Sequence, residues 1–224
     1  MFQRALILVA ISAAFASGFP PPISPCDPIT EKLQRALSPK DPHTFPIISN
    51  VDYIHYGDMY KFDFSNLTLK RFSYVNCTSF HDFEQESVAT LTFEGPSLEF
   101  DTDDVVMRSN QSGFPNPLKI PLLSWLYNYT LELSFEIDSY RSYPFSLCIS
   151  RNSLEMTFNA DEIWLVFEVS PRQKYFSKKV AKELFDHPDA VFEAINRYLP
   201  RFANNFTTTL NDILCSEPIS SLTP

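Results

Sequence analysis

The feature that most constrains this chain is a long amphipathic segment near its carboxyl end, residues 189–215. Apolar residues recur there at steps of three and four, the helical period: Phe192, Ile195, Leu199, Phe202, Phe206, Leu210 and Ile213. The other side carries Glu193, Arg197, Arg201, Asn204, Thr208, Asn211 and Asp212. The pattern predicts a helix with one broad apolar face. At about 1.5 Å per residue, this helix would be about as long as the whole domain. The part of the protein that covers its apolar face must therefore also be long.

Pro200 lies near the middle of this predicted helix. Proline lacks a backbone N–H donor and disfavours helical geometry at the residue before it, here Leu199. We therefore expect a kink at this point.

The amino-terminal residues have the pattern of a secretory leader. Arg4 supplies a short basic start, residues 5–11 are apolar, and Ala14-Phe15-Ala16 has the small-x-small form of a cleavage site. We expect residues 1–18 to be a signal peptide and residues 19–224 to form a single domain, secreted and extracellular. No later run approaches the roughly 18 apolar residues of a membrane span, so no stable membrane insertion is expected.

The formal net charge of the chain is -9 at pH 7. An acidic protein has no electrostatic reason to bind nucleic acid or anionic lipid headgroups. No nucleic-acid partner is therefore expected, and a lipid is more readily bound as a single molecule than as a membrane surface. The sequence does not identify a protein partner.

Cysteines occur at Cys26, Cys77, Cys148 and Cys215. An even number in an exported chain indicates two disulfides, for which three pairings are possible. We expect Cys26 to pair with Cys215, tying the first helix to the last, and Cys77 with Cys148 between strands. The alternative is that one or more is a buried free thiol.

Five asparagines precede a serine or threonine two residues on, without an intervening proline, and are predicted glycosylation sites: Asn66, Asn76, Asn110, Asn128 and Asn205. Asn205 falls on the polar side of the final helix. A glycan there requires that side to face water, so the helix would be covered on one flank only.

The middle of the chain has the period of β-strands. Residues 60–74 predict one long strand, or two strands joined through a bulge, and residues 89–100 predict another. The clearest strand is residues 127–138, where the inward set is Tyr127, Tyr129, Leu131, Leu133, Phe135 and Ile137. Shorter strands are predicted at residues 145–148, 154–158 and 163–169.

Helices are predicted at residues 27–37 and 177–185, an irregular segment at residues 42–50, and an exposed loop at residues 101–116. A helix, then long antiparallel strands, then helices indicate an α+β domain. Strands and a helix that are each apolar on one side can bury their apolar sides against each other if a curved sheet wraps along the helix.

Three stretches of the chain resemble the tubular lipid-binding (TULIP) superfamily, in particular its takeout, juvenile-hormone-binding and mite group 7 allergen branches. They are the opening Asp27-Pro28-Ile29-Thr30-Glu31-Lys32-Leu33, the strand of residues 62–69, and the segment of residues 184–214 with its mid-helix Leu199-Pro200. The resemblance implies a long carboxyl-terminal helix wrapped by a highly curved antiparallel sheet, holding a hydrophobic ligand and performing no chemistry.

Ligand-binding sites are largely apolar, and the predicted lining is Phe62, Phe64, Leu131, Leu133, Phe135, Ile195, Leu199, Phe202 and Phe206. Each of these residues taken singly fits a plain core position as well. As a group they favour a carrier of a small lipid or terpenoid in an apolar tunnel between sheet and helix.

No pattern of catalytic chemistry is found. The chain has four histidines and four glycines, with no G-x-S-x-G turn and no helical histidine pair. His81 with Asp82 and Glu84 fits a solvated loop better than a metal site. We therefore expect no enzyme activity, no metal and no cofactor.

Two other readings remain open. One is a lipocalin-like ligand-binding barrel, although the chain has no G-x-W near its first strand and its final helix is unusually long. The other is a glycosylated protein-interaction or immune-recognition module with a filled core.

Overall fold

The computed structural model describes residues 25–83, 88–141, 144–167 and 174–216. The predicted signal peptide, Glu84 and the end of the strand predicted at residues 163–169 lie outside these ranges.

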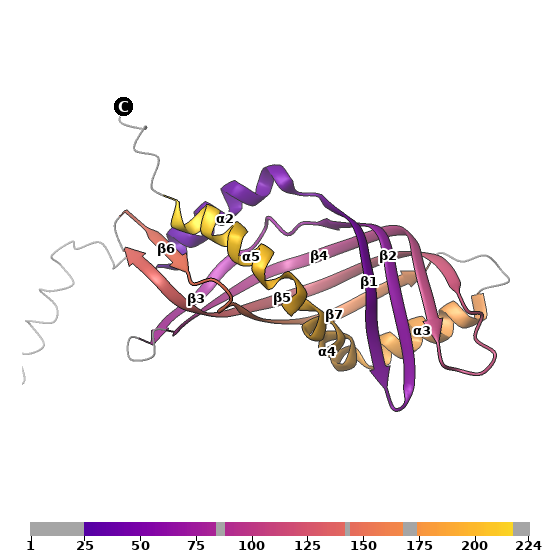
Figure 1. The fold of residues 1–224 in the computed structure, drawn as a ribbon. Helices are drawn as coiled ribbons and strands as arrows, with labels where there is room; N and C mark the ends of the chain where they lie inside the picture. The colour runs from indigo at the N-terminus through magenta and orange to yellow at the C-terminus, as the bar shows by residue number, and fades with distance from the viewer. Residues whose placement is uncertain (1–24, 84–87, 142–143, 168–173, 217–224) are drawn as a thin grey trace, which may run out of the picture.

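The described chain forms one long antiparallel sheet with helices along it (Figure 1). The elements are α2 (Cys26–Leu37), the 3₁₀ turn η1 (Ser38–Lys40), β1 (His43–His55), β2 (Asp58–Lys70), β3 (Asn76–Phe83), β4 (Val88–Ser109), β5 (Leu118–Arg141), β6 (Ser146–Ile149), β7 (Glu155–Phe167), α3 (Lys174–Asp186), α4 (Pro188–Tyr198), the 3₁₀ turn η2 (Leu199–Phe202), α5 (Ala203–Leu210) and the π turn η3 (Asn211–Cys215).

The strand order is β1-β2-β4-β5-β6, with β3 also pairing with β4 and β7 with β5. The strands that the structure describes do not close into a barrel, which rules out the lipocalin-like reading. Figure 1 shows α4 and α5 running along the sheet, α2 and β6 at one end and α3 at the other. The predicted α+β fold, a long carboxyl-terminal helix wrapped by a curved antiparallel sheet, is confirmed.

Two segments predicted to be irregular are strands. The segment at residues 42–50 lies mostly in β1, an edge strand, where Pro46 costs no ladder hydrogen bond. The acidic segment after Phe100 continues β4 to Ser109, paired with β2. There Lys70 binds Glu99 at 2.6 Å and Asp101 at 3.3 Å, which offsets the clustered negative charge. The two strands predicted at residues 154–158 and 163–169 are the single β7.

The buried face of β5 changes along its length. Leu122 and Leu126 are buried at even positions, and Tyr129 and Leu133 at odd positions. Asn128 lies between them with φ of 50°, a left-handed conformation that asparagine tolerates better than most residues. The predicted unbroken alternation is therefore wrong at its first residue, because the Tyr127 side chain is 38% exposed.

The same change occurs in β2, where Phe62 is buried before Asn66 and Leu67 directly after it. Asn66 has φ of 54°. This is the slip of one residue that the strand pattern of residues 60–74 predicts. In both long strands, the buried positions therefore change from even to odd residue numbers at the left-handed asparagine.

Gly95 of β4 lies opposite Tyr129 of β5 in the strand pairing. A Cβ atom at Gly95 would lie 2.3 Å from the Tyr129 ring, so the ring occupies the space that any larger residue would need. The ring is buried and stacks on Phe158 with centroids 6.0 Å apart. Burial, followed by the charge of Asp41, raises the pKa of Tyr129 to about 12, so the phenol stays protonated at neutral pH.

We predict that Gly95→Ala lowers the free energy of unfolding by about 1–3 kcal/mol, the usual cost of overpacking. The measurement is urea unfolding followed by circular dichroism. In a Tyr129→Ala background the space is free, so the same substitution should cost much less. Equal costs in the two backgrounds would show that the ring does not require the glycine.

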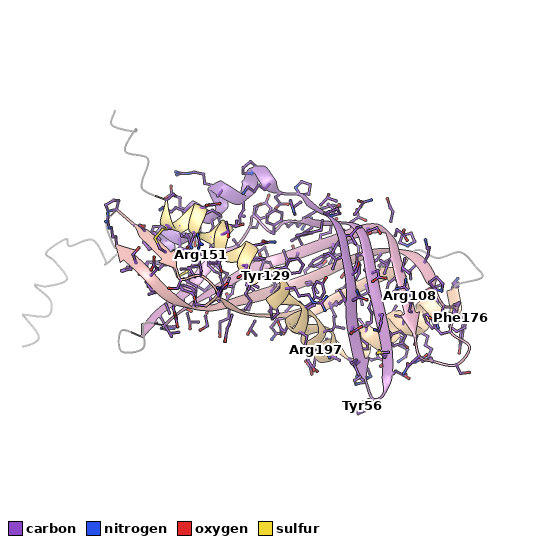
Figure 2. All side chains as sticks on the ribbon, in the orientation of Figure 1. Tyr56, Arg108, Tyr129, Arg151, Phe176 and Arg197 are labelled. Atoms are coloured by element: carbon purple, nitrogen blue, oxygen red, sulfur yellow. A yellow bond between two sulfur atoms is a disulfide. The ribbon has the colours of Figure 1, made fainter. Side chains whose placement is uncertain are left out.

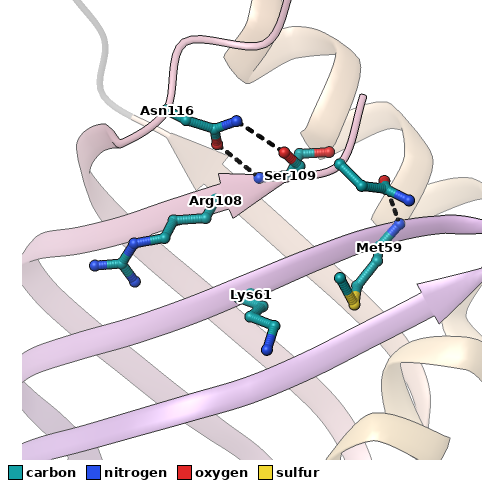
Figure 3. A pocket seen from close by; sticks show the side chains of 6 residues that line it. Met59, Lys61, Arg108, Ser109 and Asn116 are labelled. Carbon is teal, nitrogen blue, oxygen red and sulfur yellow. Dashed lines mark hydrogen bonds between the residues drawn. The ribbon is translucent and has the colours of Figure 1, made fainter. Parts of the chain in front are cut away.

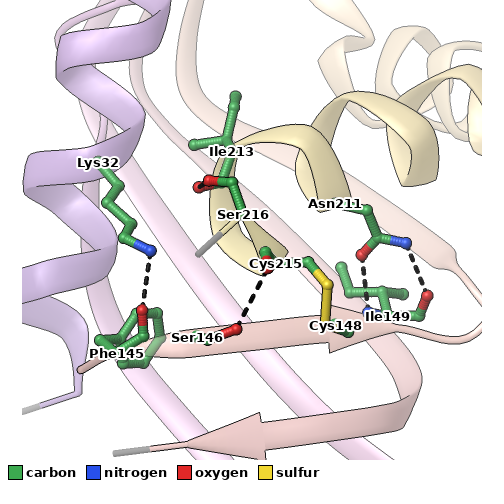
Figure 4. The surroundings of a disulfide bond; sticks show 9 residues. All are labelled: Lys32, Phe145, Ser146, Cys148, Ile149, Asn211, Ile213, Cys215 and Ser216. Atoms are coloured by element: carbon green, nitrogen blue, oxygen red, sulfur yellow. Dashed lines mark hydrogen bonds between the residues drawn. A yellow bond between two sulfur atoms is a disulfide. The ribbon is translucent and has the colours of Figure 1, made fainter. Parts of the chain in front are cut away.

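All four cysteines form disulfides, as predicted, but the predicted pairing is wrong. The bonds are Cys26–Cys77 and Cys148–Cys215. Each bond joins a terminal helical segment to the strand on which it packs. The first segment, α2, packs on β3, and Thr30 of α2 accepts a hydrogen bond from the Cys77 N–H at 2.8 Å. The last segment, η3, packs on β6. Figure 4 shows the second bond. Spacing along the chain could not identify these partners, because docking of helix on strand sets them.

The carboxyl-terminal helix changes its hydrogen bonding at Pro200, which lies in the 3₁₀ turn η2, so the predicted irregularity is present. Phe192 and Leu210 are buried as predicted. After the turn, however, Thr207 and Leu214 are buried in place of Phe206 and Ile213. A 3₁₀ turn advances about 120° per residue and an α-helix about 100°, so the phase of a continuous helix is lost at η2.

Two asparagines attach this helix to the free edges of β7 and β6. Asn196 of α4 accepts a hydrogen bond from the Phe158 N–H at 2.7 Å and donates one to the Phe158 carbonyl at 3.0 Å. Asn211 of η3 makes the same pair with Ile149, both at 2.8 Å (Figure 4). Periodicity places Asn211 on the solvent side, but its amide replaces a missing neighbouring strand.

We predict that Asn196→Ala and Asn211→Ala each lower the free energy of unfolding by about 2 kcal/mol, because each leaves a strand N–H and carbonyl without partners. The matched control is Asn204→Ala on the exposed side of α5, which should change stability by less than about 0.5 kcal/mol. Chemical denaturation of the three variants measures this. A control as destabilised as the other two would contradict the assigned role.

Candidate ligand-binding site

The inner apolar surface falls into three clusters along the sheet. The α2 cluster, at the α2–β6 end, includes Leu91, Leu133, Phe135, Leu147 and Leu214. The α3 cluster, at the other end, includes Tyr53, Tyr60, Phe62, Met107 and Val180. The middle cluster consists of Leu98, Leu126, Tyr129, Phe158, Ala160, Ile163 and Phe192.

The nine predicted ligand-binding residues are divided among these clusters. Leu131, Ile195 and Leu199 come together at the middle cluster, where each is partly buried. Leu133 and Phe135 are fully buried in the α2 cluster. The structure therefore unites only part of the predicted set at one place.

Phe62 is buried in the α3 cluster, and Phe64 packs against its edge with the two rings stacked 6.1 Å apart. These two residues lie at the end of the sheet away from the α2 cluster.

Phe202 and Phe206 lie on the helix beyond the middle cluster. Phe202 contacts Tyr198 and Phe45, with ring centroids 5.4 and 6.5 Å apart. The Phe206 side chain is 38% exposed. Phe45 belongs to β1, which the sequence did not predict to be a strand, so its contact with the helix could not be anticipated.

The middle cluster has the fewest buried members of the three clusters and about as many partly buried neighbours as the other two. Around its seven buried members lie eight apolar side chains that are only partly buried. They come from both layers: Leu69, Phe72, Phe100, Leu131, Leu165, Val191, Ile195 and Leu199. An apolar surface contributed by sheet and helix is thus incompletely covered at this level of the fold.

One row of this surface crosses four strands. Leu69 of β2 pairs with Phe100 of β4, which pairs with Ser124 of β5, which pairs with Leu165 of β7. Ser124 is buried and has the shortest side chain of the four. The periodicity of the sequence marks Leu69 and Phe100 as strand residues, but only the register of the strands places them in one row.

Two polar hollows open on the surface, and none of the nine predicted residues lines either. The larger, about 710 Å³, is lined by Ser38, Asp41, Pro42, Lys70, Arg71, Ser73, Tyr74, Pro96, Ser97 and Glu99. The smaller, about 260 Å³, is lined by Met59, Lys61, Arg108, Ser109, Asn110 and Asn116 (Figure 3). The figure shows the amide of Asn116 bonded to the Ser109 backbone.

The cations of the larger hollow are already paired. Lys70 binds Glu99, and this hydrogen bond raises the pKa of Lys70. Arg71 lies 4.0 Å from the same carboxylate. Since the acids balance these cations, the hollow has no excess positive charge for an anion.

All five predicted glycosylation asparagines are exposed. Asn205 faces solvent on the uncovered flank of α5, where a glycan would fit. Asn110 is engaged locally, because its side chain bonds the Met59 N–H and the Gly57 carbonyl. Use of these sites stays a prediction.

None of the helices that the structure describes combines the length and the apolar character required to cross a membrane.

No protein-family model matches the sequence, and no curated protein matches it significantly. Among solved structures, the chain is similar to Takeout 1 of Epiphyas postvittana, with a TM-score of 0.61 and 12% identity over 87% of this chain and 92% of that one. It is also similar to a lipopolysaccharide binding protein, with a TM-score of 0.31 and 14% identity over 81% of this chain and 37% of that one, which is too low to carry an argument.

At 12% identity, the likeness to Takeout 1 shows the fold and not the ligand. It agrees with the open curved sheet and the long carboxyl-terminal helix described above. The chain therefore has the fold of Takeout 1, as the resemblance in its sequence predicts.

Proposed function

We propose that this protein is a secreted carrier that binds one small hydrophobic molecule, a lipid or terpenoid, between the sheet and the carboxyl-terminal helix, without catalysis. The observation that carries the proposal is the middle cluster, where eight apolar side chains from both layers are only partly covered. A ligand lying on them would cover the apolar surface that the seven buried members of this cluster leave partly exposed.

The energetics favour such a ligand. Burying apolar surface stabilises a complex by about 25 cal/mol per Å². A ligand of a few hundred Å² would therefore bind with micromolar or better affinity after the costs of association. The row from Leu69 to Leu165 offers no charged group, so selection would rest on shape and length.

Secretion is supported by the leader pattern of residues 1–18 together with the two disulfides, which fit an oxidising compartment. We place the protein in the extracellular space. A carrier there would keep an oily molecule in solution.

A single substitution separates a carrier from a module with a filled core. We predict that Ser124→Leu weakens binding of a fluorescent fatty acid at least tenfold while leaving the free energy of unfolding unchanged within about 1 kcal/mol, because the larger side chain occupies space meant for the ligand. If the core is filled, the same change overpacks it and lowers stability by about 1–3 kcal/mol.

The matched control is Ser134→Leu, the same change on the same strand at a half-buried position next to the buried Leu133 and Phe135. Probe affinity should not change there. Native mass spectrometry of the gently purified protein provides a second measurement and should reveal a stoichiometric apolar molecule. An empty protein that binds neither fatty acids nor isoprenoids would overturn the proposal.

A further inference from the structure

Three side chains from distant parts of the sequence meet beside the α3 cluster. His55 is the last residue of β1, Glu183 lies in the final turn of α3, and His187 directly precedes α4. Figure 1 shows the β1–β2 hairpin reaching toward α3 and α4. The His55 Nδ1 atom lies 2.8 Å from the Glu183 Oε1 atom, and the His187 Nε2 atom lies 4.0 Å from that same oxygen.

We propose that His55, Glu183 and His187 form a binding site for a divalent transition-metal ion, with zinc as the preferred ion. Their three donor atoms all lie within 4.8 Å of one another. Zinc binds imidazole nitrogen and carboxylate oxygen at about 2.0–2.2 Å, so neighbouring donors in a tetrahedral site are roughly 3.4 Å apart. Small side-chain rotations would bring the three donors to this geometry.

The donor set suits zinc in particular. Two imidazoles and one carboxylate are ligands that zinc accepts readily, with a fourth position left for water. Calcium and magnesium prefer oxygen ligands, which this cluster cannot supply in number. The side chains are 17%, 26% and 38% exposed for His55, Glu183 and His187, so an ion could enter from solvent and still be partly enclosed.

A simple histidine–carboxylate hydrogen bond explains the position of His55 next to Glu183, but not that of His187. His187 adds a second imidazole, whose ring lies over that of His55 with centroids 3.8 Å apart and planes at 36°. Within the described residues, Glu183 has no lysine or arginine in an ion pair, since Lys179 bonds Gln111 and Lys182 bonds Asp186. One carboxylate thus faces two imidazoles, while the nearby Lys182 ammonium is held by Asp186 and acts on Glu183 through its charge alone.

A second observation comes from Tyr53 on β1. Its side chain is 2% exposed, and its hydroxyl has no hydrogen-bond partner among the described residues. The ring lies 6.3 Å from that of His55, and the Glu183 charge acts on the hydroxyl. A buried donor without a partner is costly. A metal-bound water or a reoriented Glu183 oxygen would give it an acceptor, as hydrogen-bonding groups around metal ligands commonly do.

An ion at this position would join the tip of the β1–β2 hairpin to the junction of α3 and α4. His55 and Glu183 are 128 residues apart, so the ion would close a long loop and favour the folded state. It would also fix the end of the sheet next to the α3 cluster. This role is independent of whether the middle cluster binds a lipid.

The test is a zinc titration of the full chain after removal of bound metals, by isothermal calorimetry and by thermal unfolding. We expect one ion per chain and a melting temperature that rises with zinc concentration. His55→Ala, Glu183→Gln and His187→Ala should each weaken zinc binding at least tenfold. His81→Ala, which removes an exposed histidine on β3, is the control and should leave the affinity unchanged.

Spectroscopy of the unsubstituted chain keeps the test valid if a variant fails to fold. Cobalt bound in place of zinc should show the visible absorption of a low-symmetry four-coordinate site, and zinc X-ray absorption should show two imidazole ligands. Absence of stoichiometric binding at 100 μM zinc, equal loss of affinity in the His81 control, or a spectrum without imidazole would overturn the proposal.

Discussion

The structure depends on how the carboxyl-terminal helix is joined to the free edge of the sheet. Among the strands that the structure describes, β6 and β7 each pair only with β5, so both expose backbone donors and acceptors on their outer side. Asn196 and Asn211 satisfy those groups as a neighbouring strand would, and the Cys148–Cys215 bond adds a covalent tie. An uncovered edge invites pairing with other chains, and an undocked helix would expose its apolar face. The same contacts cover the strand edges and keep the apolar face of the helix on the sheet.

Attachment at these two points fixes what lies between them. Asn196 anchors the helix before the 3₁₀ turn and Asn211 anchors it after α5, so the segment between them, with Leu199, lies over the middle of the sheet. The clusters on either side are closed by α2 and by α3, which pack onto the two ends of the sheet. At the middle, residues of the carboxyl-terminal helix pack on a cluster with seven buried members and eight partly buried ones. The position that we propose for a ligand is this middle part of the sheet.

The sequence predicted which side of an element is apolar better than it predicted which residues of different elements meet. Ile195, Leu199 and Leu131 were found from their period, because a period reports which side of an element is apolar. It cannot report which apolar residues of other elements meet them, so Phe62 and Phe64 were grouped with Leu133 and Phe135, although the two pairs belong to clusters at opposite ends of the sheet. The histidine cluster shows the same limit. Glu183 and His187 are one helical turn apart in the sequence, but His55 reaches them only through the β1–β2 hairpin.

The sequence by itself determined the helical stripe of residues 189–215, the alternation of the long strands, the α+β class and the presence of two disulfides. These are properties of neighbours along the chain, where the backbone geometry of a single element sets the pattern. The tertiary structure alone decided the cysteine partners, the strand character of β1 and the second half of β4, and the exposure of Tyr127 and Phe206. The cysteine partners depend on which strand each helix packs on, and the strand character of these segments depends on pairing with a distant strand, which outweighs the local turn residues. The exposure of Tyr127 and Phe206 depends on backbone conformations that a regular period does not include, the left-handed Asn128 and the 3₁₀ turn η2.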